Sequence, residues 1–153
     1  MNLKPFKLQL PEGQLSEHFT LQEMIQSATA ERLGIDNTPP ATAIELLRDL
    51  CQQTLEPLRR VAGVPLHVNS GYRCRELNEA VRGAVNSQHR RGEAADITTG
   101  DWLMNRKLLG LLLSSGIPFD QCIAEKCNNS GCPKWLHISY RKVCRSEVIY
   151  NYF

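Results

Sequence analysis

Two short stretches of the chain, some forty residues apart, decide how it can fold. They are Ser87-Gln88-His89-Arg90-Arg91-Gly92-Glu93-Ala94-Ala95-Asp96 and Trp135-Leu136-His137-Ile138-Ser139. The small residues after His89 allow the backbone to turn tightly and to bring this histidine back toward Asp96. His137 alternates with apolar residues, so it points to one face of a strand. Both stretches therefore fit a loop that runs into a strand, with a second strand beside it.

These stretches predict a metal site made of His89, Asp96 and His137. Three protein ligands of this kind leave the fourth tetrahedral position of zinc open, as in catalytic rather than structural sites. Taken one by one, His89 fits a surface histidine, His137 fits a core histidine, and Asp96 could pair with a cation instead, because an unpaired buried carboxylate is unfavourable. Together they indicate a metallohydrolase with one zinc ion per chain.

Composition indicates one ordinary domain, with residues 1–15 as an extended N-terminal arm. The chain has 153 residues and a formal net charge of +2. Its basic residues form short pairs such as Arg59-Arg60 and Arg90-Arg91 and no longer run, which is too little for a nucleic-acid surface, and no stretch approaches the roughly 20 apolar residues of a membrane span. Residues 1–6 lack the apolar run of a signal peptide. We expect a soluble monomer, made in the cytoplasm, that binds neither nucleic acid nor membrane.

Hydrophobic periodicity predicts helices in the first part of the chain and strands in the last. This order favours an α+β fold, an antiparallel sheet flanked by helices, in which the last three strands form a meander. A capping-box spacing, Thr20 followed by Glu23, marks the start of the first helix. The expected helices cover residues 21–27, 41–60, 76–81 and 102–114, and the expected strands cover residues 66–70, 94–98, 121–125, 135–140 and 147–150.

Six cysteines are many for a chain of this size, yet none forms the Cys-x-x-Cys pair of a zinc ribbon. Free or structural thiols are the favoured interpretation. Cys127 and Cys132 bracket a turn-forming Asn-Asn-Ser-Gly sequence and are the best candidates for a disulfide. A separate metal knot between Cys122 and Cys144 that includes His137 is a weaker alternative.

The site residues also carry a resemblance to a known family. Ser-Gln-His-x-x-Gly-x-Ala-Ala-Asp at 87–96 and Trp-Leu-His-Ile-Ser at 135–139 resemble the zinc D-alanyl-D-alanine carboxypeptidase family of peptidoglycan metallopeptidases, of the hedgehog/DD-peptidase fold. Further similar segments are residues 16–20, 37–40, 68–73 and 118–121, so the resemblance covers nearly all of residues 15–140. It is strongest with the single-domain subgroup found in bacteria and their phages or prophages.

The resemblance implies roles for individual residues. His89, Asp96 and His137 would bind zinc, which activates water for attack on a peptide carbonyl and stabilises the oxyanion. Arg73 would polarise that carbonyl or hold the substrate, Tyr72 beside it would contact the substrate, and Ser87 would hydrogen-bond a substrate carboxylate. The substrate would be a stem peptide of peptidoglycan. For Arg73 a surface salt bridge, and for Ser87 a turn, are the alternative roles.

The general base is where the sequence departs from well-known relatives, which place a glutamate three residues before the last histidine. That position is Lys134 here, and a protonated lysine cannot accept a proton, so we expect it to be exposed. Glu125 replaces it in this interpretation, because a neighbouring antiparallel strand could aim its carboxylate toward the metal. Glu93 and Asp120 are weaker candidates, with solvent exposure and a structural turn as their alternative roles.

Three functions therefore stay open at this stage. The first is a D,D-carboxypeptidase, and the second is an endopeptidase of endolysin type, because the same zinc ligands serve both reactions. The third is a zinc-containing binding or phage structural module without turnover, which Lys134 favours. Either peptidase would act on the cell wall after export or release by lysis.

Overall fold

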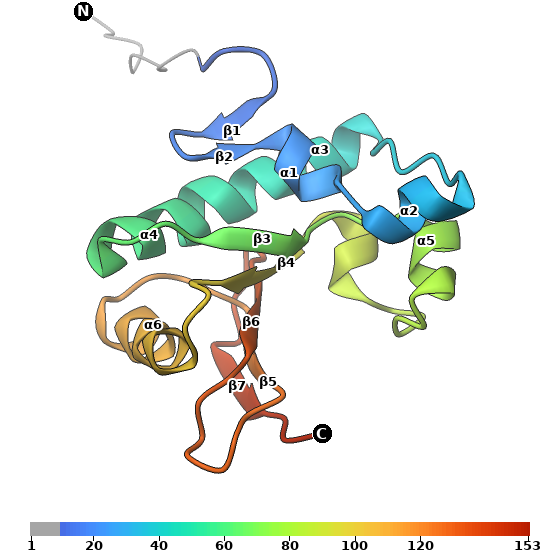
Figure 1. Cartoon of the computed structure of the whole chain (residues 1–153). Coiled ribbons are helices and arrows are strands. Elements are labelled where there is room, and N and C mark those ends of the chain that lie inside the picture. The colour runs from blue at the N-terminus through green and yellow to red at the C-terminus, as the bar shows by residue number, and fades with distance from the viewer. Residues whose placement is uncertain (1–9) are drawn as a thin grey trace, which may run out of the picture.

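A five-stranded mixed sheet forms the centre of the computed structural model, which describes residues 10–153. The strand order is β3-β4-β6-β5-β7, and all neighbours are antiparallel except β5 and β7, which are parallel. The strands are β3 (His67–Ser70), β4 (Ala94–Thr98), β5 (Gln121–Glu125), β6 (Trp135–Ser139) and β7 (Glu147–Tyr150). The α+β prediction is confirmed, and Figure 1 shows the helices set around this sheet.

The predicted antiparallel meander is wrong for its last strand. After β6 the chain crosses β5 and returns beside it, so that Gln121 pairs with Glu147 and Ala124 with Tyr150 in parallel register. Two hydrogen bonds extend the pairing at its ends, since Glu147 N donates to Asp120 O at 3.0 Å and Asn151 N donates to Ala124 O at 2.8 Å. A short strand carries no local signal for the direction of its partner.

The helices follow the predicted pattern with two differences. The capping box of Thr20 and Glu23 is present, but the first predicted helix ends early, and a separate helix begins after the Ser27 cap. Among residues 10–153, none of the helices has the length and apolar character needed to cross a bilayer. The helical elements are α1 (Leu21–Ile25), α2 (Ala28–Leu33), α3 (Ala41–Leu50), the π-helical turn η1 (Cys51–Leu55), α4 (Glu56–Ala62), α5 (Arg75–Ala80), the 3₁₀ turn η2 (Gln88–Arg91) and α6 (Trp102–Ser114).

The predicted helix over 41–60 is one continuous helical run from α3 through η1 to α4 (Figure 1). Its middle turn widens to a π-helix immediately before Pro57, and Glu56 N donates to Cys51 O. Proline has no N–H and its ring clashes with the carbonyl four residues earlier, and a wider turn relieves both problems without ending the helix.

The hydrophobic core lies between one face of the sheet and the helices α3, α4 and α6. Residues that point to this face are fully buried, among them Ala95 and Ile97 of β4 and Leu136 and Ile138 of β6. Because side chains alternate along a strand, Asp96 and His137 point to the opposite face. The apolar alternation of β4 and β6 therefore selects the face on which the polar site lies.

The predicted N-terminal arm is only partly separate from the domain. Its first nine residues lie outside the described part of the chain, but β1 (Gln14–Ser16) pairs with β2 (Phe19–Thr20), and Leu15 is buried in the core. A two-stranded hairpin has no sustained period in sequence, so its packing was not predicted.

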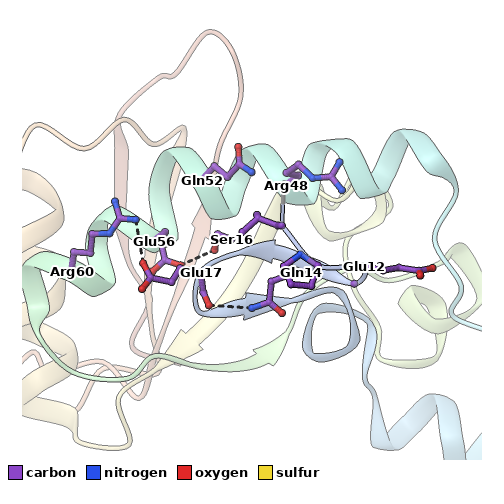
Figure 2. A pocket seen from close by; sticks show the side chains of 11 residues that line it. Glu12, Gln14, Ser16, Glu17, Arg48, Gln52, Glu56 and Arg60 are labelled. Atoms are coloured by element: carbon purple, nitrogen blue, oxygen red, sulfur yellow. Dashed lines mark hydrogen bonds and ion pairs between the residues drawn. The ribbon is translucent and has the colours of Figure 1, made fainter. Parts of the chain in front are cut away.

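This hairpin packs against the long helical run through a buried carboxylate. Glu56 accepts hydrogen bonds from Ser16 Oγ at 2.9 Å and from the backbone N of His18 at 2.6 Å, and His18 Nδ1 lies 2.9 Å from it. A pocket of about 740 Å³ opens beside this contact (Figure 2), lined by residues 10–14, 16 and 17 and by polar side chains of the helix such as Arg48, Gln52 and Arg60. Glu56 has its partners, so we assign this contact to folding.

All six cysteines are free, which confirms the favoured interpretation. The disulfide suggested for Cys127 and Cys132 is absent; both are buried, and Cys127 Sγ donates to Ala124 O at 3.3 Å. The loop between them is closed by its own hydrogen bonds instead, with Asn128 Oδ1 accepting from Ser130 N and Cys132 N.

A buried asparagine on α6 connects the end of β4 to the start of β6. Asn105 Nδ2 donates to Lys134 O at 2.8 Å, and Asn105 Oδ1 accepts from Thr99 N at 2.8 Å. We expect Asn105→Ala to lower the free energy of unfolding by about 2 kcal/mol, because it removes a buried side chain that is the hydrogen-bond partner of part-buried backbone groups at Thr99 and Lys134. Urea denaturation measures this, with the exposed Leu113→Ala on the same helix as control. Equal small effects of both changes would contradict it.

Candidate metal centre

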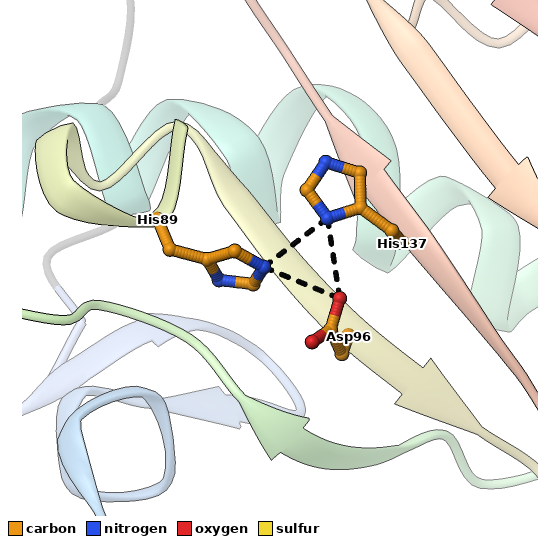
Figure 3. A group of neighbouring side chains, drawn as sticks. All are labelled: His89, Asp96 and His137. Atoms are coloured by element: carbon orange, nitrogen blue, oxygen red, sulfur yellow. Dashed lines mark hydrogen bonds and ion pairs between the residues drawn. The ribbon is translucent and has the colours of Figure 1, made fainter. Parts of the chain in front are cut away.

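Three side chains from three different elements meet on the open face of the sheet. His89 lies on η2, Asp96 on β4 and His137 on β6. Asp96 and His137 are directly opposite each other in the antiparallel register of β4 and β6. Figure 3 shows the two rings and the carboxylate converging on one point. The three residues predicted as ligands are therefore brought together.

The distances between the three converging atoms fit a tetrahedral metal ion. His89 Nε2 lies 3.1 Å from His137 Nδ1, and each of these nitrogens lies 3.2 Å from Asp96 Oδ1. Ligands about 2.0–2.1 Å from a tetrahedral ion are separated from one another by roughly 3.3 Å. A triangle with these edges holds such an ion without rearrangement of the side chains.

The hydrogen bond on the far side of the His89 ring fixes its tautomer. His89 Nδ1 lies 2.7 Å from Gly71 O, and a carbonyl can only accept, so Nδ1 carries the proton and Nε2 presents a lone pair to the site. Such a backbone acceptor behind a ligand histidine orients the ring and makes its nitrogen a better donor to a metal.

Two glycines allow the backbone to place His89. A Cβ at Gly71 would lie 2.4 Å from Met24 O, so only glycine can bring the accepting carbonyl this close to α1. Gly92 ends η2 with φ +83°, and a Cβ there would lie 2.5 Å from Ala43 O. Ser87 begins the same turn by accepting from His89 N. The expected tight turn between His89 and Asp96 is present.

The charge of the site favours a cation. Burial opposes ionisation of the Asp96 carboxyl, but the neighbouring His89 and His137 rings outweigh burial and hold the pKa of Asp96 well below its ordinary value. The Asp96 side chain is 20% exposed and that of His89 is 2% exposed. A carboxylate and two imidazole nitrogens facing one another in so little water form a set that a divalent ion satisfies.

Within residues 10–153, this is the one group of three or more metal-ligating side chains close enough to hold an ion. His137 belongs to it and not to the cysteine-rich end of the chain. The alternative of a separate metal knot between Cys122 and Cys144 is therefore wrong.

The comparisons with known proteins agree with this geometry. The sequence profile of a family described as Peptidase M15 matches residues 17–132, which is most of the chain. The chain belongs to this family. The predicted membership in a family of peptidoglycan metallopeptidases is thereby confirmed, and the protein is a metallopeptidase. The match contains His89 and Asp96 and ends before β6, which carries His137.

Two further comparisons add less. A crystal structure of the L-Ala D-Glu endopeptidase ChiX of Serratia marcescens is similar to this chain with a TM-score of 0.43 and 18% sequence identity, over 66% of this chain and 89% of that one. A comparison with curated proteins finds no match.

The residues expected to contact substrate in this M15 peptidase occupy different environments. Arg73 is half-buried, its Nε has no hydrogen-bond partner, and burial lowers the pKa of its guanidinium while the Asp96 carboxylate acts against this. Its backbone N donates to His89 O at 3.0 Å. Tyr72 is buried in the core, where its ring packs rather than faces the pocket beside the metal centre.

The proposed base lies on the same sheet face as the ligands but not directly opposite them. Ile123 is the β5 residue opposite His137, and Glu125 lies two positions further, opposite Trp135. Glu125 Oε2 accepts from Asn151 Nδ2 at 2.9 Å. Lys134 is exposed, as expected. Glu93 is not solvent-exposed but forms ion pairs with Arg91 and Arg141.

Asp120 is a structural residue whose role sequence reasoning described only as a turn. Its side chain is 0% exposed, binds Arg145 through Nε at 3.1 Å and Nη2 at 2.8 Å, and accepts from Gln88 Nε2 at 2.9 Å. It thus connects the residue before His89 to the segment after β6. The aspartate itself was visible in the sequence, but its partner 25 residues away was not.

A pocket of about 450 Å³ opens beside His137. It is lined by η2 and the loop before it, by β5, and by the segment after β6, and includes Ser87, Gln121, His137 and three arginines. Ser87, one of the expected substrate-binding residues, therefore lies in the pocket beside the metal centre. Its oxygen accepts from His89 N, and its hydroxyl proton has no protein acceptor among residues 10–153.

Removing one of the three predicted ligands should strongly weaken metal binding. We expect Asp96→Asn and His137→Ala to weaken binding more than about 100-fold, since even an outer partner of a ligand contributes 10–100-fold. Mass-spectrometric metal analysis after dialysis measures this, with the exposed His67→Ala on β3 as the control. One ion retained by both site variants would contradict the assignment.

The Asp120 ion pair should make stability depend on pH in the acid range. Hydrogen bonds from Arg145 lower the pKa of Asp120 from 3.8 to about 2 despite its burial. Because the folded-state pKa is depressed, the stabilisation is complete above pH about 4 and is lost as the pH falls toward 2, amounting to roughly 2 kcal/mol. Denaturation of metal-free protein should show a loss between pH 4 and 2 that is larger in wild type than in Asp120→Asn by about this amount, since the other carboxyl groups titrate in both. Parallel pH profiles would refute it.

Proposed function

We propose that this metallopeptidase binds zinc at His89, Asp96 and His137 and hydrolyses peptide bonds of peptidoglycan stem peptides. The observation that carries the proposal is the triangle of two imidazole nitrogens and one carboxylate oxygen, 3.1–3.2 Å apart, in a member of the M15 family. Imidazole and carboxylate ligands suit zinc, and three of them leave a coordination position open. Zinc held there supplies a Lewis acid for a peptide carbonyl and for water.

Arg73 is proposed to bind the scissile carbonyl. A planar guanidinium with a buried Nε and no protein partner for it is a preorganised donor, and its proximity to Asp96 places it beside the metal ligands. Ser87 is proposed to donate its hydroxyl proton to a carboxylate of the substrate. Tyr72, which precedes Arg73, is buried in the core, and its predicted contact with substrate stays a prediction.

Glu125 is proposed as the general base. Its strand runs beside that of His137, and both side chains point to the same face. Asn151 holds its carboxylate through one oxygen, Oε2, which leaves Oε1 available to accept a proton. Glu125 lies opposite Trp135, two positions along the strand from the residue opposite His137. A proton would therefore reach Glu125 directly over that separation or through a water molecule.

Either of two reactions follows from this assignment, a D,D-carboxypeptidase reaction or endolysin-like endopeptidase cleavage. The proposed place of action is the cell wall, reached by export or by release on lysis. The second candidate function is a zinc-containing binding module without turnover. Two observations favour it: Lys134 stands where well-known relatives have a glutamate, and the carboxylate of Glu125 is already engaged by Asn151.

Hydrolysis of purified muropeptides by the zinc-loaded protein tests the proposal. We expect new peptide products by mass spectrometry, and we expect Glu125→Gln to lower kcat by about 10²–10⁴-fold while one zinc ion stays bound, since general bases contribute this much. His89→Ala should lose both zinc and products. Glu79→Gln, an exposed glutamate on α5, is the matched control with full activity.

The outcomes separate the two candidates. No products from protein with stoichiometric zinc would establish the binding module in place of the peptidase. Products that persist at the wild-type rate in Glu125→Gln would keep the peptidase and remove Glu125 as its base.

A further inference from the structure

The pocket beside His137 has an unusual charge distribution. Its lining contains Arg91, Arg141 and Arg145 and no carboxylate. The three arginines come from two segments, η2 and the stretch that follows β6, so the fold and not the local sequence gathers them. They share this pocket with Ser87, whose hydroxyl oxygen caps η2 by accepting from His89 N. The pocket is therefore a cluster of hydrogen-bond donors next to a metal ligand.

The carboxylates that neutralise these arginines lie behind them and fix their positions. Glu93 receives both Arg91 Nη2 at 3.1 Å and Arg141 Nε at 3.0 Å on the same oxygen. One carboxylate between two guanidinium groups leaves a net positive charge. Among residues 10–153, the terminal nitrogens of Arg141 have no protein hydrogen-bond partner. Arg141 is thus held through its Nε, and its terminal nitrogens keep their donors for a ligand in the pocket that this residue lines.

Arg145 is held in the same manner. Its Nε and Nη2 bind the fully buried Asp120 carboxylate, while Nη1 lies 3.8 Å from Glu147, too far for a hydrogen bond. A guanidinium that is anchored on one side and open on the other is preorganised for a second carboxylate, since little side-chain entropy remains to be lost.

We propose that this pocket is a subsite that binds a carboxylate of the substrate next to the scissile bond. The proposal rests on the proposed peptidase function and specifies its substrate: a peptide with an anionic group on the His137 side of the metal. Planar guanidinium donors match a carboxylate in shape as well as charge. Stem peptides of the lysine type offer such a group at two places, the C-terminal carboxylate or the free carboxylate of an internal γ-linked D-glutamate.

Three synthetic peptides distinguish the two sources. The first is L-Ala-γ-D-Glu-L-Lys-D-Ala-D-Ala, the second is its C-terminal amide, and the third has D-isoglutamine in place of D-glutamate. The measured quantity is kcat/KM of the zinc-loaded protein, or the calorimetric dissociation constant for any peptide that is not cleaved. Removing the bound carboxylate should weaken kcat/KM or binding about tenfold or more, because a hydrogen bond to a charged group is lost.

The arginine variants test which residues cause this preference. We expect Arg141→Gln and Arg91→Gln to lose most of the wild-type discrimination between the carboxylate peptide and its amide form. Arg75→Gln, on the exposed face of α5, should retain it. Arg145→Gln is a poorer probe, because it leaves the buried Asp120 without its partner. Circular dichroism and zinc content confirm that each variant is folded and loaded.

The results distinguish the source of the carboxylate, and they separate failure of the subsite from failure of the peptidase function. Sensitivity to the C-terminal amide assigns the pocket to a terminal carboxylate, and sensitivity to D-isoglutamine assigns it to the internal one. If the peptides are cleaved but neither change alters kcat/KM more than about twofold, the subsite is wrong and the peptidase stands. If no peptide is cleaved, the proposed function fails, and the same ratio of dissociation constants then supports or overturns the subsite independently.

Discussion

The register between β4 and β6 is the constraint on which the site depends. It places Asp96 directly opposite His137 and, one residue away on either side, sends Ala95, Ile97, Leu136 and Ile138 into the core. A slip of one residue would exchange the two faces, burying the ligands and exposing the apolar side chains. The free energy of core packing therefore also fixes the positions of Asp96 and His137, and these two residues need no further contacts to face each other.

The third ligand depends on backbone contacts rather than on a strand. His89 lies on a single 3₁₀ turn, which would be mobile in isolation, but three neighbours restrain it: the Gly71 carbonyl on its ring, the Arg73 amide on its carbonyl, and the Asp120 carboxylate on the side chain of Gln88. Two of these neighbours follow β3, whose pairing with β4 shifts register between Val68 and Ser70. This bulge directs the chain toward the metal centre.

Local patterns predicted the elements well, because α6, β4 and β5 follow from hydrophobic periodicity and from Gly and Pro at their ends. The ligand triad was also predictable, since His, Asp and His in strand and loop positions limit the possible chemistry. The parallel pairing of β7, the burial of Leu15 and the free state of Cys127 and Cys132 depend on contacts between distant segments, for which a single sequence carries no local signal.

The arginines of the pocket also could not be recognised as a cluster from local sequence patterns. In the sequence, Arg141 and Arg145 look like ordinary surface charges in a polar connection between β6 and β7. Their side chains are oriented only because the fold brings two carboxylates to them. Glu93, which precedes β4, pairs with Arg141, and Asp120, which precedes β5, pairs with Arg145. Both arginines lie beyond residues 17–132, the part that matches the family. In this proposal, His89 and Asp96 lie in the part shared with the family, and two of the three pocket arginines lie in the C-terminal segment. The two functions are still connected, because Arg145 binds the Asp120 carboxylate that also holds Gln88 beside His89.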